Sequence, residues 1–182
     1  MKGVPILMMN SGDSVDFDTV TIGGQIWMAY NMDIDDAGAG IYDPNGSSGN
    51  VASYGRLYTL AAAQRIAATI SGWRVPTRTD FQTLDGYITP SSGGKMKETG
   101  TTYFQTPNTG ATNSVNFNGR AAGSYNSIGF YSNFYTWNQF LTSTSAGGSN
   151  IYMFILKYDD ANLSEASTAT TSNAYSVRLI KE

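Results

Sequence analysis

Segments with helical periodicity are confined to the first half of this 182-residue chain, and that distribution most constrains its fold. Residues 57–70 combine apolar spacing with many alanines and predict one helix. A second helix is predicted to begin after Thr77, an N-cap residue with Asp80 three positions further on, and to end at Gly86. Helices that come early, followed by strands and long loops, predict the α+β class.

Strand patterns lie on both sides of the predicted helices. Residues 19–28 indicate two short strands around a Gly-Gly turn, and residues 1–9 indicate an earlier strand. Residues 151–158 and 175–180 predict two further strands near the end of the sequence. Residues 90–123 are rich in Gly, Thr and Asn with little periodicity, so we expect a long loop there.

The composition removes several classes of chemistry. The chain has no His and no Cys, which excludes a Ser-His-Asp triad, a cysteine nucleophile, an ordinary zinc site and any disulfide. A net charge of −3 argues against nucleic-acid binding, and no apolar run is long enough for direct membrane insertion. No signal peptide is visible, because the apolar stretch in residues 1–9 is too short. The length predicts a single domain over residues 1–182.

An acidic, Gly-rich loop is predicted over residues 33–50. Carboxylates from Asp33, Asp35, Asp36 and Asp43 could hold Ca²⁺, but their spacing lacks the distal Glu of an EF-hand. We therefore favour a solvated loop and expect no metal and no cofactor. The remaining carboxylates do not lie in phrases typical of a buried catalytic acid, so we expect no enzyme activity.

Thirty-six consecutive residues, 121–156, carry no charge and hold nine of the 23 aromatic residues. The rest of this segment is largely Ser, Asn, Gly and Thr, so its composition resembles that of an antibody paratope. Burial in a core would explain Phe130, Trp137 and Phe154 taken singly. Residues 131–135 fit neither an alternating strand nor a helix face, so some of their rings should be exposed and mark a binding surface.

Several phrases resemble one bacterial domain family, the Fibrobacter succinogenes major paralogous domain. They occur in the family's order at residues 24–31, 54–59, 71–77, 110–113 and 176–178. The Gly-Trp-Arg-Val-Pro-Thr phrase is the most specific of them. The resemblance implies a C-type-lectin-like fold with two helices, a twisted antiparallel sheet and long loops on one side. Similar domains occur on surface proteins and as variable proteins of diversity-generating retroelements, in which a C-terminal segment is rewritten by mutagenic retrohoming.

Two departures from the family pattern bear on this interpretation. The family commonly has Cys just before its Ser-Gly-Trp phrase and just after Ser-Val-Arg, where this chain has Thr69 and Leu179. Losing both removes a disulfide that the resemblance implies, which would suit folding in a reducing cytoplasm, as for a virion protein. A lineage or engineering choice would explain the loss equally. Where the family has Trp-Ser-Ser-Thr, this chain keeps Trp137 and continues with Asn138 and Gln139. A diversified surface on a constant scaffold would give this pattern, and ordinary divergence would give it too.

The uncharged segment and the resemblance together predict a ligand-binding protein with a variable segment over residues 124–160. Its expected partner is a protein or glycan on a target cell, and its expected location is a virion or cell surface. The alternative is an invariant cell-surface or polysaccharide-associated module of the same family. In the strand at 151–158, one face is assigned to the core and the other at least partly to the ligand. The predicted binding residues are Tyr125, Tyr131, Asn133, Phe134, Tyr135, Asn138, Gln139, Phe140, Tyr152, Phe154 and Tyr158.

Overall fold

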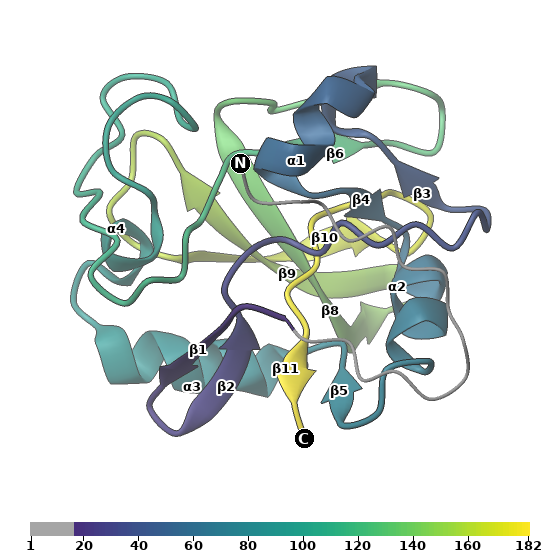
Figure 1. Ribbon diagram of the computed structural model, residues 1–182, viewed down its shortest axis with the longest axis horizontal. Coiled ribbons are helices and arrows are strands. Elements are labelled where there is room, and N and C mark those ends of the chain that lie inside the picture. Colours follow the sequence, from purple (N-terminus) through teal and green to yellow (C-terminus); the bar gives the residue numbers. More distant parts are fainter. Residues whose placement is uncertain (1–16) are drawn as a thin grey trace.

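The computed structural model describes residues 17–182, which combine helices with antiparallel sheets and so confirm the α+β class (Figure 1). The strand predicted at residues 1–9 lies outside the described residues. The helices are α1 (Val51–Tyr54), α2 (Leu60–Ala67), α3 (Arg78–Ile88) and α4 (Ser92–Met96), with short 3-10 helices η1 (Pro44–Gly46) and η2 (Ser48–Asn50). The strands are β1 (Thr19–Ile22), β2 (Gln25–Met28), β3 (Ile41–Tyr42), β4 (Leu57–Tyr58), β5 (Trp73–Arg74), β6 (Ser124–Tyr125), β7 (Tyr131–Ser132), β8 (Trp137–Gly147), β9 (Asn150–Lys157), β10 (Ser164–Thr170) and β11 (Ile180–Lys181).

A small sheet with the order β1-β2-β11-β5 brings together strands from the beginning and the end of the described chain. Its β1–β2 hairpin is the one predicted from the sequence, with Gly23 and Gly24 at φ angles of 57° and 85° in the turn. The predicted closing strand is shorter than expected, because only β11 joins this sheet. Residues 174–176 instead form isolated bridges to three separate segments, so they tie loops together rather than extend a sheet.

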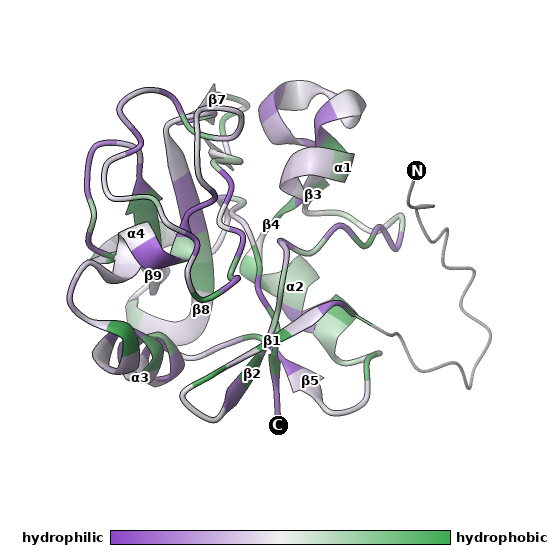
Figure 2. Cartoon of the chain, turned by 60° about the vertical axis from the view of Figure 1, so that its left-hand side comes forward, coloured by the Kyte–Doolittle hydropathy of each residue, from purple (hydrophilic) through white to green (hydrophobic). Residues whose placement is uncertain are grey.

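The three-stranded sheet β10-β9-β8 is covered on both faces. On one face, Ile151, Met153 and Ile155 of β9 share a hydrophobic cluster with residues of α2. On the other face, Phe154 and Leu156 share a second cluster with residues of α3. Figure 2 shows the matching hydrophobic colouring in β8 and β9 and on parts of α2 and α3. The assignment of one face of β9 to a ligand is therefore wrong, since α3 covers that face.

Both predicted helices exist, but their ends differ from the prediction. The first begins at Leu60 because Thr59 caps it, and the two residues before the cap form β4 instead. The second has the predicted N-cap, with a full capping box between Thr77 and Asp80. It continues past Gly86 to Ile88, which is buried in the α3 cluster. Core packing of Ile88 therefore extends the helix past Gly86, although by sequence alone that glycine predicts the end of the helix.

The loop predicted over residues 90–123 contains α4 and is otherwise irregular. A buried lysine fastens it to the end of β9. The Lys97 ammonium donates to the carbonyl oxygens of Thr109, Lys157 and Asp160 at 2.8, 2.8 and 2.9 Å. These three bonds satisfy all the N–H groups of the ammonium, as a buried cation requires. No helix within residues 17–182 is long and apolar enough to span a membrane.

Candidate functional site

Aromatic rings from several segments gather at one end of the molecule, where α1, β3 and β6 lie (top of Figure 1). The rings of Tyr42 and Tyr125 stack with centroids 4.0 Å apart, and Tyr131 follows at 4.8 Å from Tyr125. Tyr54 lies 4.9 Å from Phe134. These side chains, with Tyr103, pack around one small hydrophobic cluster and remain partly exposed except for Tyr54. We call the set the aromatic strip: Tyr42, Tyr54, Tyr103, Tyr125, Tyr131 and Phe134.

The connection between β6 and β7 extends the aromatic strip with two fully apolar side chains. Ile128 is 77% exposed and Phe130 is 64% exposed. They lie in residues 126–130, which we call the apical turn. Large apolar side chains exposed next to partly exposed rings form the kind of surface that marks a binding site.

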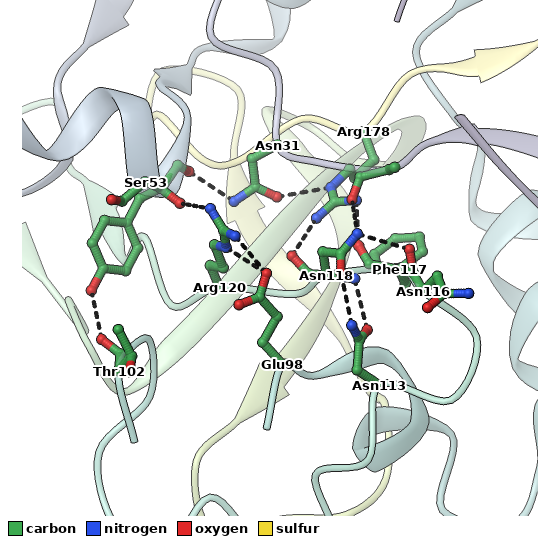
Figure 3. Close-up of polar contacts among 12 residues, drawn as sticks. Asn31, Ser53, Glu98, Thr102, Asn113, Asn116, Phe117, Asn118, Arg120 and Arg178 are labelled. Carbon is green, nitrogen blue, oxygen red and sulfur yellow. Dashed lines mark hydrogen bonds and ion pairs between the residues drawn. The ribbon is translucent and has the colours of Figure 1, made fainter. Parts of the chain in front are cut away.

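Arg120 joins the strip to the loop beside it (Figure 3). Its Nε and Nη2 bind Glu98 Oε1 at 2.8 and 2.6 Å, and its Nη1 donates to the Ser53 carbonyl at 2.8 Å. The guanidinium carbon also lies 4.0 Å from the ring centre of Tyr103 and 4.9 Å from that of Tyr30. A single side chain thus fixes α1, the loop after α4 and two rings in one arrangement.

Arg178 is fully buried and donates four hydrogen bonds to uncharged acceptors. Its Nε donates to Asn31 Oδ1 at 2.9 Å, and its Nη1 to the carbonyls of Met28 and Phe117 at 3.0 and 2.6 Å. Its Nη2 donates to the Asn118 carbonyl at 2.9 Å. Burial lowers the pKa of the guanidinium, whereas these four acceptors stabilise its charged form.

Asn31 links this buried guanidinium to the aromatic strip, and Figure 3 shows it between Arg178 and α1. Its Nδ2 donates to the Tyr54 carbonyl at 2.9 Å. The hydroxyl of Tyr54 donates to the Thr102 carbonyl at 3.4 Å, and that of Tyr135 donates to the carbonyl of the preceding residue, Thr101. Burial raises the pKa of Tyr54 further above neutral pH. Hydrogen bonds therefore fix Tyr54 of the strip at both its backbone and its hydroxyl.

Several predicted binding residues lie at this surface. Tyr125, Tyr131 and Phe134 belong to the aromatic strip, and Tyr135 is partly exposed beside it. Asn133 is partly buried, with its backbone in the left-handed region at φ 59°, which Asn tolerates better than most residues. The structure therefore brings together most of the predicted set from the first part of the uncharged segment.

Other predicted binding residues are core residues, and the prediction is corrected for them. Asn138 and Phe140 are fully buried in β8, and Gln139 and Phe154 are almost fully buried. A ligand cannot reach these four side chains without unfolding the sheet. The lack of charge in this stretch reflects burial here rather than a binding role.

Two predicted tyrosines lie away from the strip. Tyr152 packs under the Arg78 guanidinium, 4.1 Å from the ring centre, and Arg78 also pairs with Glu165 at 2.7 Å. Tyr158 packs against the α3 cluster. Neither tyrosine belongs to the hydrophobic cluster around which the aromatic strip packs.

Sequence reasoning missed Tyr42, Tyr54 and Tyr103 of the strip, together with Ile128 and Phe130 of the apical turn. The interpretation of Phe130 as a core residue is wrong, because that side chain is 64% exposed. Each of these tyrosines lies outside the uncharged segment, so composition gave no reason to group them with it. Tyr42 offered the clearest signal, because it is a large ring in a loop of Gly, Asp, Asn and Ser. Such a ring has few local partners and is expected near a surface.

The acidic loop is more ordered than predicted, since it contains β3, η1 and η2. Arg56 pairs with both Asp35 and Asp43, and Arg65 binds Asp36 with Nε–Oδ2 at 2.6 Å. The hydrogen bond from Arg65 lowers the pKa of Asp36 to about 2. Within residues 17–182 no three Asp or Glu side chains are grouped so that they could hold a metal ion.

Three carboxylates outside the acidic loop, Asp80, Glu98 and Glu165, are each engaged by a separate arginine. Asp80 binds Arg74 at 2.6 and 3.0 Å, and Glu98 binds Arg120. The hydrogen bonds from Arg74 and Thr77 outweigh desolvation and lower the pKa of Asp80. These carboxylates serve as partners of arginines that fasten loops and helix ends.

Fold and surface define an α+β domain whose buried polar frame supports a surface of aromatic side chains. The chain belongs to the Fibrobacter succinogenes major domain family, whose model matches residues 20–181. The resemblance seen in the sequence is thereby confirmed. Comparison with curated proteins and with solved structures gave no match.

Proposed function

We propose that this chain is a non-enzymatic binding protein that presents the aromatic strip and the apical turn to a protein or glycan on a target cell. We further propose that its fold is C-type-lectin-like and that it serves as the variable protein of a diversity-generating retroelement. Display on a virion or cell surface follows from this role. The invariant surface module of the same family remains the alternative.

The contiguous, partly exposed aromatic surface is the observation that carries this proposal. Single exposed apolar residues are normal on a protein surface. Five partly exposed rings next to two exposed apolar side chains form a contiguous patch instead. Tyrosine contributes contact area and a hydroxyl for the loss of only two rotatable angles. Arg120 and Asn31 hold Tyr103 and Tyr54 of the strip in place before a ligand arrives, which lowers the entropy cost of binding.

Diversification makes a prediction about where copies of the gene should differ. The exposed positions 127, 128, 130 and 132 of the apical turn and β7 can change with little effect on the core. Gly129 has a φ of 98°, so it should stay glycine. Positions 138–141 are buried and should stay nearly constant. The varying positions should descend from adenine-containing codons such as those of Asn.

Sequencing many copies of the gene from its source population tests the proposal. Variation concentrated in 127–132 and adjoining strip positions, and low in 138–141, supports a diversified surface. Variation spread evenly along the chain removes diversification and leaves the invariant module. Neighbouring genes separate the same alternatives: a reverse transcriptase and a template repeat favour the first, a polysaccharide locus the second.

A further inference from the structure

Strand β5 lies at one edge of the four-stranded sheet, next to β11. The pairing of the two strands fixes where the main-chain groups of β5 point. Glu182 N–H donates to the Gly72 carbonyl at 2.9 Å, and Trp73 and Arg74 pair with the two preceding residues of β11. Hydrogen-bonded and non-hydrogen-bonded pairs alternate in an antiparallel ladder. The main-chain groups of Trp73 and Val75 therefore point away from β11.

Most of these outward main-chain groups have no partner that the fold supplies. Trp73 N–H donates to the Ile70 carbonyl at 3.2 Å. Among residues 17–182, no hydrogen-bond partner is found for the Trp73 carbonyl or for the N–H and carbonyl of Val75. Val75 is only 5% exposed. Buried main-chain groups are almost always hydrogen-bonded in folded proteins, so one donor and two acceptors at this edge need an added partner.

A hollow of about 350 Å³ lies along the same edge. Ala67 and Ala68 at the end of α2 line it together with Val75, which gives it an apolar floor. Ser143 of β8 lines it as well, but its N–H donates to the Pro76 carbonyl at 2.8 Å and so leaves the groups of Val75 uncovered. Figure 1 shows β5 at the opposite end of the molecule from α1, β3 and β6, so this edge is separate from the aromatic strip.

The hollow carries one negative charge without a counter-ion. Arg74 lines it, but the guanidinium is bound by Asp80 at 2.6 and 3.0 Å, and that pair is neutral as a unit. Glu182 lines it too and forms no ion pair within the described part of the chain. A Lys or Arg on an incoming segment would therefore be attracted to the Glu182 carboxylate.

We propose that the open edge of β5 binds an extended segment of a partner protein, which adds a strand beside residues 73–75 and brings a Lys or Arg to Glu182. A strand offers main-chain N–H and C=O groups at the regular spacing that an open sheet edge requires. A neutral sugar has neither a backbone with that spacing nor a cation for the carboxylate. This second binding surface goes beyond the proposed function and does not depend on it.

Peptides selected from a random phage-displayed library, against the full chain, provide the probe. Each selected peptide is synthesised with one backbone amide at a time replaced by its N-methyl form. Alternate amides of a bound strand face the sheet edge and the others face away. We therefore expect methylation to lower affinity at least about tenfold at every second position and less than about twofold at the positions between them.

Two substitutions in the protein test the place of binding. Ala68→Trp should fill the hollow, because Ala68 is exposed and lines it. Ala61→Trp is the matched control, since Ala61 is exposed on α2 away from the hollow. We expect the first to weaken peptide binding at least about tenfold and the second less than about twofold. Glu182→Gln tests the charge independently: replacing the peptide's basic residue by Ala should weaken binding to the wild type but not to this variant.

Amide hydrogen exchange locates the added strand on the protein. Val75 N–H should exchange at least about tenfold more slowly in the peptide complex than in the free chain. Unchanged exchange at Val75, equal effects of methylation at all positions, or failure to select any peptide would overturn the proposal. A concentration-dependent dimer that Ala68→Trp abolishes would also overturn it, because a second copy would then occupy the edge. None of these outcomes bears on ligand binding by the aromatic strip.

Discussion

Replacement of Arg178 by Met should destabilise the protein strongly, although it removes a charge from the core. The buried guanidinium donates to one side-chain oxygen and three backbone carbonyls. Methionine fills much of the same volume but donates nothing. Because the backbone carbonyls cannot be replaced along with the arginine, they remain buried without a partner.

The size of the expected destabilisation follows from the number of carbonyl groups left without a donor. Each unsatisfied buried acceptor costs about 1–3 kcal/mol, and relief from burying a cation offsets part of the sum. We expect a net loss of about 3–4 kcal/mol in the free energy of unfolding, within the range for a broken buried network. For a domain of this size that corresponds to a fall of roughly 6–16 °C in Tm. Arg178→Lys should recover only part of the loss, because a single ammonium cannot reach acceptors spread around a planar group.

Denaturant unfolding followed by tryptophan fluorescence measures this loss. Arg65→Met is the matched control, since Arg65 makes an exposed ion pair with Asp36 and should change stability far less than Arg178→Met does. If Arg178→Met costs no more than this control, the four hydrogen bonds do not hold the frame and the account of the frame is wrong.

Three further predictions use the same unfolding assay. Gln139→Met should stabilise the fold by about 1 kcal/mol, because the buried amide has only long contacts, of 3.4 Å to an amide and 3.9 Å to a sulfur. Gly94→Ala should cost about 1–3 kcal/mol, since a Cβ there overlaps the Gly110 carbonyl. Gly86→Ala has open space around its Cβ and should gain about 0.5–1 kcal/mol. Equal effects of the two substitutions would contradict the packing described for Gly94. Burial lowers the pKa of Lys97 to about 8, so between pH 8 and 10.5 the unfolded chain binds the extra proton and the contribution of Lys97 to stability should rise with pH. Lys97→Met should lack that rise, and parallel pH profiles would refute it.

Local chemistry made part of the fold predictable. The Gly-Gly hairpin and the capping box at Thr77 depend on neighbours two or three positions away, and both occur as predicted. Tertiary packing decided the rest. Residues 57–58 pair with β3 and Tyr175 rather than join α2, and the burial of Ile88 extends α3 beyond Gly86. Those partners are distant in sequence, so no local pattern reports them.

The candidate surface was only half predictable for a related reason. Tyr125 and Tyr131 were found because they lie in a segment of unusual composition. Tyr42 stacks on Tyr125 from 83 positions earlier in the chain, and that pairing exists only after folding. Tyr54 likewise enters the strip through α1, a helix of four residues that the sequence did not predict.

Absence of charge has two different physical causes within the same 36 residues. In β8, burial explains the absence of charge. Phe140 lies in the α3 cluster, where an unpaired charge would cost several kcal/mol. In the apical turn no burial enforces neutrality: Ser127 and Ile128 face water, where a Lys or Glu would cost almost nothing in stability. Stability therefore cannot account for the neutral, apolar turn. A contact that buries Ile128 and Phe130 can account for it, because a charge at their positions would then be desolvated on binding.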